Sequence, residues 1–294
     1  MTGRPRVSVV LPCRNSAATI ARQLDALAHQ EWDEPWELVV ADNGSTDETR
    51  SIVQRYLGKI PDLRIVDALE HAGVSHACNV GIREAHADAI VICNDDDEVA
   101  EGWLAAMGDA LERHDLVAGR LDHDKLNDAS AAELRGRPQT DELPRWSVGT
   151  HLPFAFGCTL GVRRSLHEAI GGFDEELRPA GEDIDYCWRA QYAGATIYFE
   201  RRAVTHYRAR SGLGATYRQA RNYGVADVLL YAKHRRLGLP EVANPVRRGL
   251  RAWAHTATML LTATNRARLA VFLWHFGWRA GTLKAAVRHR VMLL

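Results

Sequence analysis

Short apolar runs alternate with amphipathic stretches along the first 100 residues. Four runs rich in β-branched residues have the length of buried strands, and they are residues 7–12, 36–41, 63–66 and 89–93. Between the first two runs, Ile20, Leu24 and Leu27 recur at the three- and four-residue spacing of a helix. This alternation predicts βαβ units and a mostly parallel sheet flanked by helices, in the α/β class.

Residues 100–210 continue the alternation with one interruption. Helices are expected at about 102–113 and from 165, and strands at 156–162, 196–199 and 203–206. The interruption is the polar stretch 119–150, which contains Gly and Pro and has little pattern. We expect a long, partly mobile segment there, of the kind that often covers a site. Glu182 and Asp183 open a further helix, where the helix dipole alone favours acidic residues.

The end of the chain is basic and is expected to be helical at 213–236 and at about 245–289. Its two apolar faces are Leu250, Trp253, Ala257, Leu260 and Leu261, and Leu269, Phe272, Leu273, Phe276, Leu283 and Val287. Residues 201–294 carry 18 Lys and Arg but two acidic residues, whereas residues 1–200 carry 19 and 35. We therefore expect two regions, 1–210 and 211–294, and an anionic partner for the second. Packing on the first region, a homodimer and a membrane surface all fit.

The remaining composition excludes several classes of protein. The five cysteines are scattered without a C-x-x-C pair, which argues against a zinc site or a disulfide framework and suits a reducing cytoplasm. We expect no signal peptide, and no apolar run reaches the roughly 18 residues of a spanning helix. No nucleic-acid partner is expected.

The apolar run 89–93 ends abruptly in Asn94, Asp95, Asp96, Asp97 and Glu98. Carboxylates crowded at the end of a strand repel one another, and a divalent cation with oxygen ligands would compensate them. A solvated acidic turn is the alternative. In open α/β sheets, ligands bind beyond the carboxyl ends of the strands, so Asp42, at the end of the second run, is expected near these aspartates. Neither a G-x-G-x-x-G motif after the first strand nor a P-loop is present, so phosphate would be neutralised by metal.

Several separated motifs occur in a familiar order. They are Val9-Val10-Leu11-Pro12, Ala41-Asp42-Asn43-Gly44-Ser45-Thr46-Asp47, Ala77-Cys78-Asn79-Val80-Gly81-Ile82, Asn94-Asp95-Asp96-Asp97, Gly171-Gly172-Phe173-Asp174, Gly181-Glu182-Asp183, Trp188-Arg189 and His206. Each motif is weak alone, but their order and spacing are specific. Over about residues 6–207 the chain resembles a family-2 glycosyltransferase with the GT-A (Rossmann-like) fold.

The resemblance implies a role for particular residues. Those on the nucleotide side are Pro12, Arg14, Asn15, Asp42, Asn79 and Asp95, with Asp42 on the base and Asp95 on the ribose. Asp96 would hold Mn²⁺ or Mg²⁺ at the diphosphate, and His206 would complete the metal site. Asp183 would be the general base of an inverting displacement, with Glu182 and Trp188 on the acceptor side.

The activity implied is transfer of a sugar from a nucleoside-diphosphate sugar, of the UDP type, to the hydroxyl of a glycan, a lipid-linked or a small-molecule acceptor. Such a reaction belongs to bacterial glycan, glycolipid or natural-product assembly, in the cytoplasm or on the inner face of the membrane. Two positions depart from the family: Cys78 replaces a common arginine, and Asn94 starts the aspartate run. Arg14 or a tail arginine could supply the missing charge. A sugar nucleotidyltransferase and a catalytically impaired sugar-nucleotide binder remain as alternatives.

Overall fold

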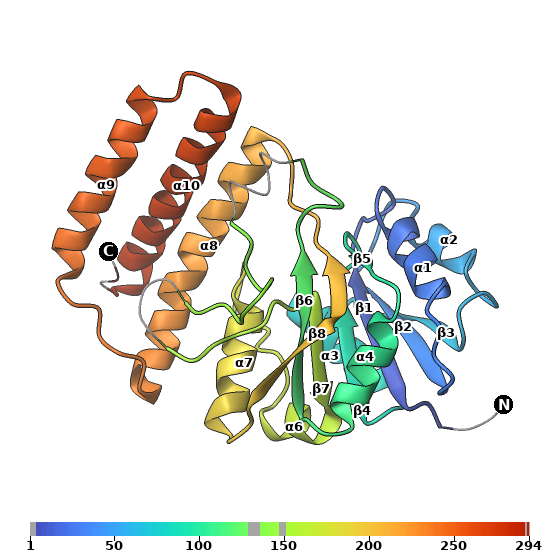
Figure 1. The fold of residues 1–294 in the computed structure, drawn as a ribbon. Helices are drawn as coiled ribbons and strands as arrows, with labels where there is room; N and C mark the ends of the chain where they lie inside the picture. Colours follow the sequence, from blue (N-terminus) through green and yellow to red (C-terminus); the bar gives the residue numbers. More distant parts are fainter. Residues whose placement is uncertain (1–3, 129–135, 147–150, 292, 294) are drawn as a thin grey trace.

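The structure, a computed structural model, describes residues 4–128, 136–146, 151–291 and 293. Its centre is one eight-stranded sheet with the order β3-β2-β1-β4-β7-β6-β8-β5 (Figure 1). The strands are β1 Val7–Cys13, β2 Trp36–Asp42, β3 Leu63–Asp67, β4 Ala89–Cys93, β5 Glu98–Val99, β6 Leu116–Asp122, β7 Thr159–Arg163 and β8 Ile197–His206. The α-helices are α1 Ile20–Ala28, α2 Thr49–Gln54, α3 Val74–Glu84, α4 Trp103–Leu111, α6 Arg164–Ala169, α7 Glu182–Tyr192, α8 Leu213–His234, α9 Pro245–Leu261 and α10 Arg266–His289.

The first four strands pair in parallel, as the sequence predicts. Successive side chains of a strand point to opposite faces of the sheet, so β1 divides its residues between two cores. Val9 and Leu11 pack with α1 and α4, whereas Val10 joins the cluster that includes residues of α3 and α7. Both faces of the sheet are therefore covered by helices, which explains why β1, β2 and β4 are mostly apolar.

The second half of the sheet differs from the prediction. Strand β7 lies antiparallel between β4 and β6, and β6 occupies the start of the stretch expected to be irregular. The two strands expected at 196–199 and 203–206 form the single strand β8. Its register against β6 shifts between Gly119 and Arg120, and the exposed Arg201 and Arg202 fall within that shift. This polar interruption in the apolar pattern is thus a β-bulge and not a break between strands.

The carboxyl ends of β1, β2 and β4 meet at one edge of the sheet. The backbone N–H of Asn15 donates to Ser45 Oγ at 3.0 Å, and the backbone N–H of Arg14 lies 3.3 Å from Asp95 Oδ2. These bonds join turns that are about 30 and 80 residues apart in the sequence. The expected convergence of the polar turns is confirmed.

The basic end of the chain forms a helical layer beside the sheet (Figure 1). Helix α10 packs along α8, and α9 lies on the outer side of α10. The α8–α10 contact depends on glycine, because a Cβ atom at Gly224 would lie 2.1 Å from the carbonyl oxygen of Trp278. Among the described residues, no helix is both long and apolar enough to cross a membrane.

Candidate active site

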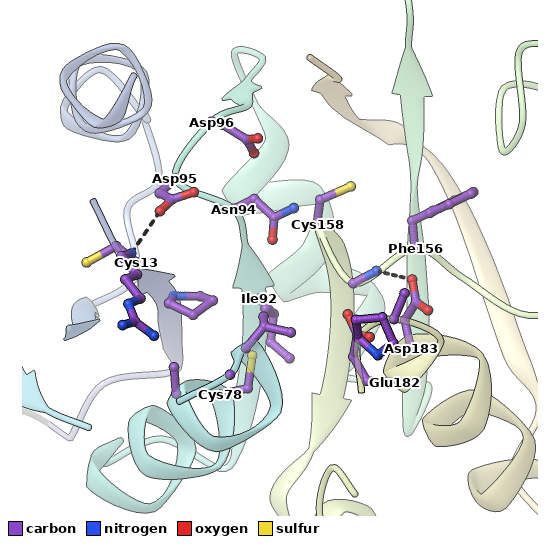
Figure 2. Close-up of a pocket in the computed structure, with 18 of the residues that line it drawn as sticks. Cys13, Cys78, Ile92, Asn94, Asp95, Asp96, Phe156, Cys158, Glu182 and Asp183 are labelled. Atoms are coloured by element: carbon purple, nitrogen blue, oxygen red, sulfur yellow. Dashed lines mark hydrogen bonds between the residues drawn. The ribbon is translucent and has the colours of Figure 1, made fainter. Parts of the chain in front are cut away.

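A cavity of about 410 Å³ opens at the edge where β1 and β4 end. Its lining residues include those from the turns after these strands, the segments before β7 and after β8, the starts of α3 and α7, and the first half of α8. Six of the residues to which the resemblance gives a role line it, namely Pro12, Arg14, Asp95, Asp96, Glu182 and Asp183. In Figure 2 the aspartate turn and the Glu182–Asp183 pair lie on different sides of this cavity.

The aspartate turn presents two carboxylates to the cavity. Asp95 accepts hydrogen bonds from the Arg14 backbone N–H and the Ser16 hydroxyl, and burial raises its pKa to about 6. Burial also raises the pKa of Asp96, against the opposing effect of Arg210 and Arg208. Asp97 is 1% exposed and accepts a hydrogen bond from the Arg208 backbone N–H at 2.7 Å. The first two aspartates therefore face the cavity, and the third anchors the segment after β8.

The second carboxylate group stands at the start of α7. Gly181 precedes the helix with φ 90°, a left-handed conformation that favours glycine. Asp183 Oδ2 accepts from the Gly157 N–H at 3.3 Å, and Oδ1 from the Ile184 N–H at 2.8 Å. Burial, followed by the charge of Asp183, raises the pKa of Glu182 to about 8, and burial raises the pKa of Asp183. A proton held on Glu182 at neutral pH leaves Asp183 as the carboxylate that can accept a proton.

Three residues predicted to meet the nucleotide do not line the cavity. Asn15 accepts a hydrogen bond from the Thr46 N–H at 2.8 Å, and Asp42 accepts one from the Ser45 N–H at 2.9 Å. Asn79 uses its amide to bond both the N–H and the carbonyl of Phe173, at 2.8 and 2.9 Å. In this structure all three hold neighbouring turns in place.

The two remaining predicted residues also lie outside the cavity. Trp188 is fully buried, and its indole N–H donates to the Leu152 carbonyl at 3.0 Å. His206 lines another cavity, where its Nδ1 lies 2.6 Å from Asp122 Oδ2. Among the described residues, no group of three or more His, Cys, Asp or Glu side chains is arranged to hold a metal ion.

Other lining residues were not found from the sequence. Arg208 and Arg210 come from the segment after β8, and Gln219, Asn222 and Tyr223 come from α8. The only signal for them was the positive charge of the tail, which did not indicate where it points. Cys78 lines the cavity where the family commonly has an arginine, and burial raises its thiol pKa, so this side chain is neutral. Arg14, Arg208 and Arg210 are the cationic side chains among the residues that line the cavity.

Comparison with known proteins agrees with this arrangement. The family model described as glycosyl transferase family 2 matches residues 8–171. Glycosyltransferase AglE of Haloferax volcanii is 28% identical over 209 residues, which cover 70% of this chain and 68% of that protein. Pre-mycofactocin glycosyltransferase of Mycobacterium tuberculosis is 25% identical over 238 residues. These residues cover 78% of this chain but 48% of that protein.

A solved structure with the same fold is the mannosyltransferase PcManGT from Pyrobaculum calidifontis in complex with GDP-Man and Mn²⁺. It superposes with a TM-score of 0.66 at 23% identity, over 97% of this chain and 88% of that one. The likeness extends through the helical tail, because it covers nearly the whole chain. Since the family model matches more than half of the residues and the fold agrees with it, the chain belongs to glycosyl transferase family 2 and is a glycosyltransferase with the GT-A fold.

Proposed function

We propose that the chain moves a sugar from a nucleoside-diphosphate sugar, of the UDP type, to an acceptor hydroxyl with inversion at the sugar carbon. The observation that carries this proposal is the single cavity between Asp95–Asp96 and Asp183. One wall offers carboxylates and arginines for a metal-bound diphosphate, and the other offers one carboxylate for the acceptor. Inversion needs only one base, because no covalent intermediate has to form.

The donor side fits a divalent cation. Asp95 and Asp96 offer carboxylate oxygens at the cavity, and burial raises the pKa of both. Mg²⁺ and Mn²⁺ sites at nucleotides take one or two carboxylates and complete their coordination with phosphate oxygens and water, so a larger protein cluster is not required. When bound, such an ion stabilises the charge of the leaving diphosphate. Asp96 is the proposed ligand and Asp95 the proposed ribose contact. His206 remains a second proposed ligand, and it would have to give up its contact with Asp122 Oδ2 to bind the metal.

The cationic side chains supply the rest of the donor site. Arg208 donates from Nε to the Asp96 carbonyl at 2.7 Å, which fixes its guanidinium beside the aspartate turn. Arg210 and Arg14 line the same cavity. Guanidinium groups bind phosphate oxygens through charge-assisted hydrogen bonds. We therefore assign to these arginines the charge that Cys78 does not provide.

On the acceptor side, Asp183 is the proposed general base. The Gly157 and Ile184 N–H groups hold its two oxygens in a fixed orientation. A carboxylate within hydrogen-bond reach of an acceptor hydroxyl takes its proton as the new glycosidic bond forms. Glu182, which holds a proton at neutral pH, keeps a second negative charge away from the acceptor.

The test separates binding from chemistry. Calorimetric titration of UDP and GDP with Mn²⁺ should give binding to the wild type, loss of metal-dependent binding in Asp96→Ala, and wild-type binding in Asp183→Asn. Turnover of a nucleotide sugar should fall by about 10²–10⁴-fold in Asp183→Asn. Asp109→Asn, the same change at an exposed position, is the control. Unchanged affinity in Asp96→Ala would refute the metal assignment. Conversion of a nucleoside triphosphate and a sugar phosphate would favour a nucleotidyltransferase.

We also propose that α9 and α10 lie on an anionic membrane surface, which places the enzyme on the cytoplasmic side as a peripheral protein. Val246, Leu250 and Leu261 recur on one side of α9 and are 56%, 69% and 84% exposed. Trp253 of this helix contacts Phe276 of α10, with ring centroids 5.9 Å apart, so the apolar sides of the two helices adjoin. Exposed apolar stripes flanked by arginine are typical of helices that lie in the membrane interface.

The charge of the two helices supports an anionic bilayer over other occupants of this face. Residues 242–294 contain nine Lys and Arg and no Asp or Glu. Within the part of the chain that the structure describes, no ion pair joins α9 or α10 to a carboxylate of residues 1–200. Apart from Arg279, which lies beside the Asp227 carboxylate, these basic side chains can meet lipid headgroups.

Vesicle co-sedimentation tests this surface. The full-length chain should bind vesicles that contain phosphatidylglycerol at low salt, should be partly released at about 0.5 M salt, and should ignore phosphatidylcholine vesicles. The double variant Leu250→Glu with Leu261→Glu should lose binding. Leu57→Glu is the matched control, because Leu57 is 54% exposed in the first region. If the wild type ignores anionic vesicles and the double variant converts a dimer into a monomer, the face is a subunit interface.

A further inference from the structure

A second cleft opens directly beside the donor cavity, with a volume of about 330 Å³. The two share Asp96, Arg208 and Arg210, so they meet at the aspartate turn. Arg218, one turn into α8, lines the second cleft but not the first, whereas Asp95 and Asp183 line only the first. The second cleft is therefore a separate space that communicates with the site of transfer.

The second cleft is strongly basic and has small walls. Three arginines, Arg208, Arg210 and Arg218, line it together with one acidic residue, Asp96. The other lining residues are alanine and serine, which leave room for a ligand. Arg208 is held in place by its bonds to the aspartate turn, from Nε to the Asp96 carbonyl and from its backbone N–H to Asp97 Oδ1, both 2.7 Å.

The beginning of α8 adds to the positive field of the second cleft. The first turn of this 22-residue helix contains no acidic residue, and no side chain caps it. The guanidinium of Arg218 lies over this turn, since a Cβ atom at Gly214 would be 3.4 Å from its Nη1. Backbone N–H groups at a helix start and arginine side chains both favour an anion. The helix start therefore adds to the positive charge that the arginines supply.

We propose that the second cleft binds a phosphate group of the acceptor, while the donor diphosphate occupies the first cavity. This inference rests on the proposed function. Planar guanidinium forks match phosphate oxygens, and Arg218 brings such a fork to a cleft whose other charged lining residues are Arg208, Arg210 and Asp96. The donor diphosphate does not need Arg218, because Asp96, Arg208 and Arg210 already border the donor cavity. A phosphate held at Arg218 would anchor the acceptor while its hydroxyl extends toward Asp183.

The test uses full-length protein saturated with Mg²⁺ and UDP and titrated with glycerol 1-phosphate in a calorimeter. Saturable binding of about one equivalent is expected, weakened by about 10- to 100-fold in Arg218→Ala, the usual effect of a hydrogen bond to a charged group. Arg218→Lys should retain part of the affinity. UDP affinity should be unchanged in both variants. Arg55→Ala, at an exposed arginine immediately after α2, is the control and should bind like the wild type.

Two results would overturn the proposal. One is that UDP-loaded wild-type protein does not bind glycerol 1-phosphate. The other is that Arg218→Ala weakens UDP binding and leaves glycerol 1-phosphate binding unaffected, which would mean that the cleft binds the donor. A parallel titration of glycerol 1-phosphate without metal or nucleotide keeps this test separate from the proposed function. If UDP does not bind at all, Arg218-dependent binding of glycerol 1-phosphate would still support the proposed phosphate site in the cleft. Absence of that binding would refute the site. Because Arg218 is exposed, equal thermal midpoints for all variants would exclude unfolding as the cause.

Discussion

Asp227 on α8 is a buried carboxylate that joins the helical layer to the rest of the protein. It is 5% exposed and accepts indole N–H bonds from Trp146 and from Trp278 of α10, both at 2.7 Å. Burial outweighs these bonds and raises its pKa to about 6. Because the folded-state pKa lies above the unfolded value of about 3.8, stability from this group is complete below about pH 4 and is lost as the pH rises through 6.

The magnitude follows from the shift. A rise of about two pKa units corresponds to roughly 3 kcal/mol in full, of which about 1 kcal/mol falls between about pH 5 and pH 7. Asp227→Asn cannot ionise, and it leaves one indole N–H without an acceptor, at a pH-independent cost of about 1–3 kcal/mol. The free energy of unfolding of the wild type should therefore exceed that of Asp227→Asn at about pH 5, and this advantage should shrink by about 1 kcal/mol at about pH 7.

Urea unfolding followed by tryptophan fluorescence measures both proteins at each pH. The exposed Asp33→Asn substitution is the control, and its difference from the wild type should not follow this course. A difference between wild type and Asp227→Asn that is constant with pH would refute the reasoning, since it would mean that the carboxylate titrates alike in the folded and unfolded chain.

Three further predictions concern the acid pair and the helix packing. Glu182→Gln replaces a side chain that already holds a proton at neutral pH, so the pKa of Asp183 and the acid limb of the kcat/KM profile should stay in place; a shift of that limb to lower pH would mean that Glu182 is ionised beside Asp183. Gly224→Ala should lower the free energy of unfolding by about 1–3 kcal/mol, because its methyl group would overlap α10, and equal stability in urea would contradict the close contact. Asp185→Asn should cost about 3–5 kcal/mol at neutral pH, because buried Asp185 pairs with Lys233 and Arg189, and a smaller loss at acidic pH would show that the carboxylate charge is responsible.

The parts of the fold that were predicted are those with a local signal. Strands β1, β2 and β4 are buried along their whole length, so their sequences are mostly apolar, and the polar residues that follow each of them mark the same edge of the sheet. The aspartate turn could be placed in the site for this reason. The shape of β8 could not be predicted, because the exposed Arg201 and Arg202 of a bulge have the same pattern as a turn between two strands.

Side-chain direction was the limit for the site. Asn79 belongs to a family motif, yet its amide is engaged with Phe173, a contact across 94 residues that no local pattern reveals. The tail was expected as a second region, 211–294, that could pack on residues 1–210, but its sequence did not indicate that Gln219, Asn222 and Tyr223 of α8 line the donor cavity. An amphipathic pattern shows that a helix has two faces, and only the tertiary structure shows what each face meets.

Helix α8 has the donor cavity on one side and α10 on the other, with Tyr223 in the cavity wall and Gly224 in the helix contact. The donor and an anionic vesicle would bind on opposite sides of this helix, so any effect of one on the binding affinity of the other must be reciprocal. If anionic vesicles raise the affinity for the donor by some factor, the donor must raise the affinity for vesicles by the same factor. Measuring either binding curve with and without the other partner therefore yields one number that describes communication in both directions, and a factor of one would mean that adjacent residues of α8 serve two independent sites.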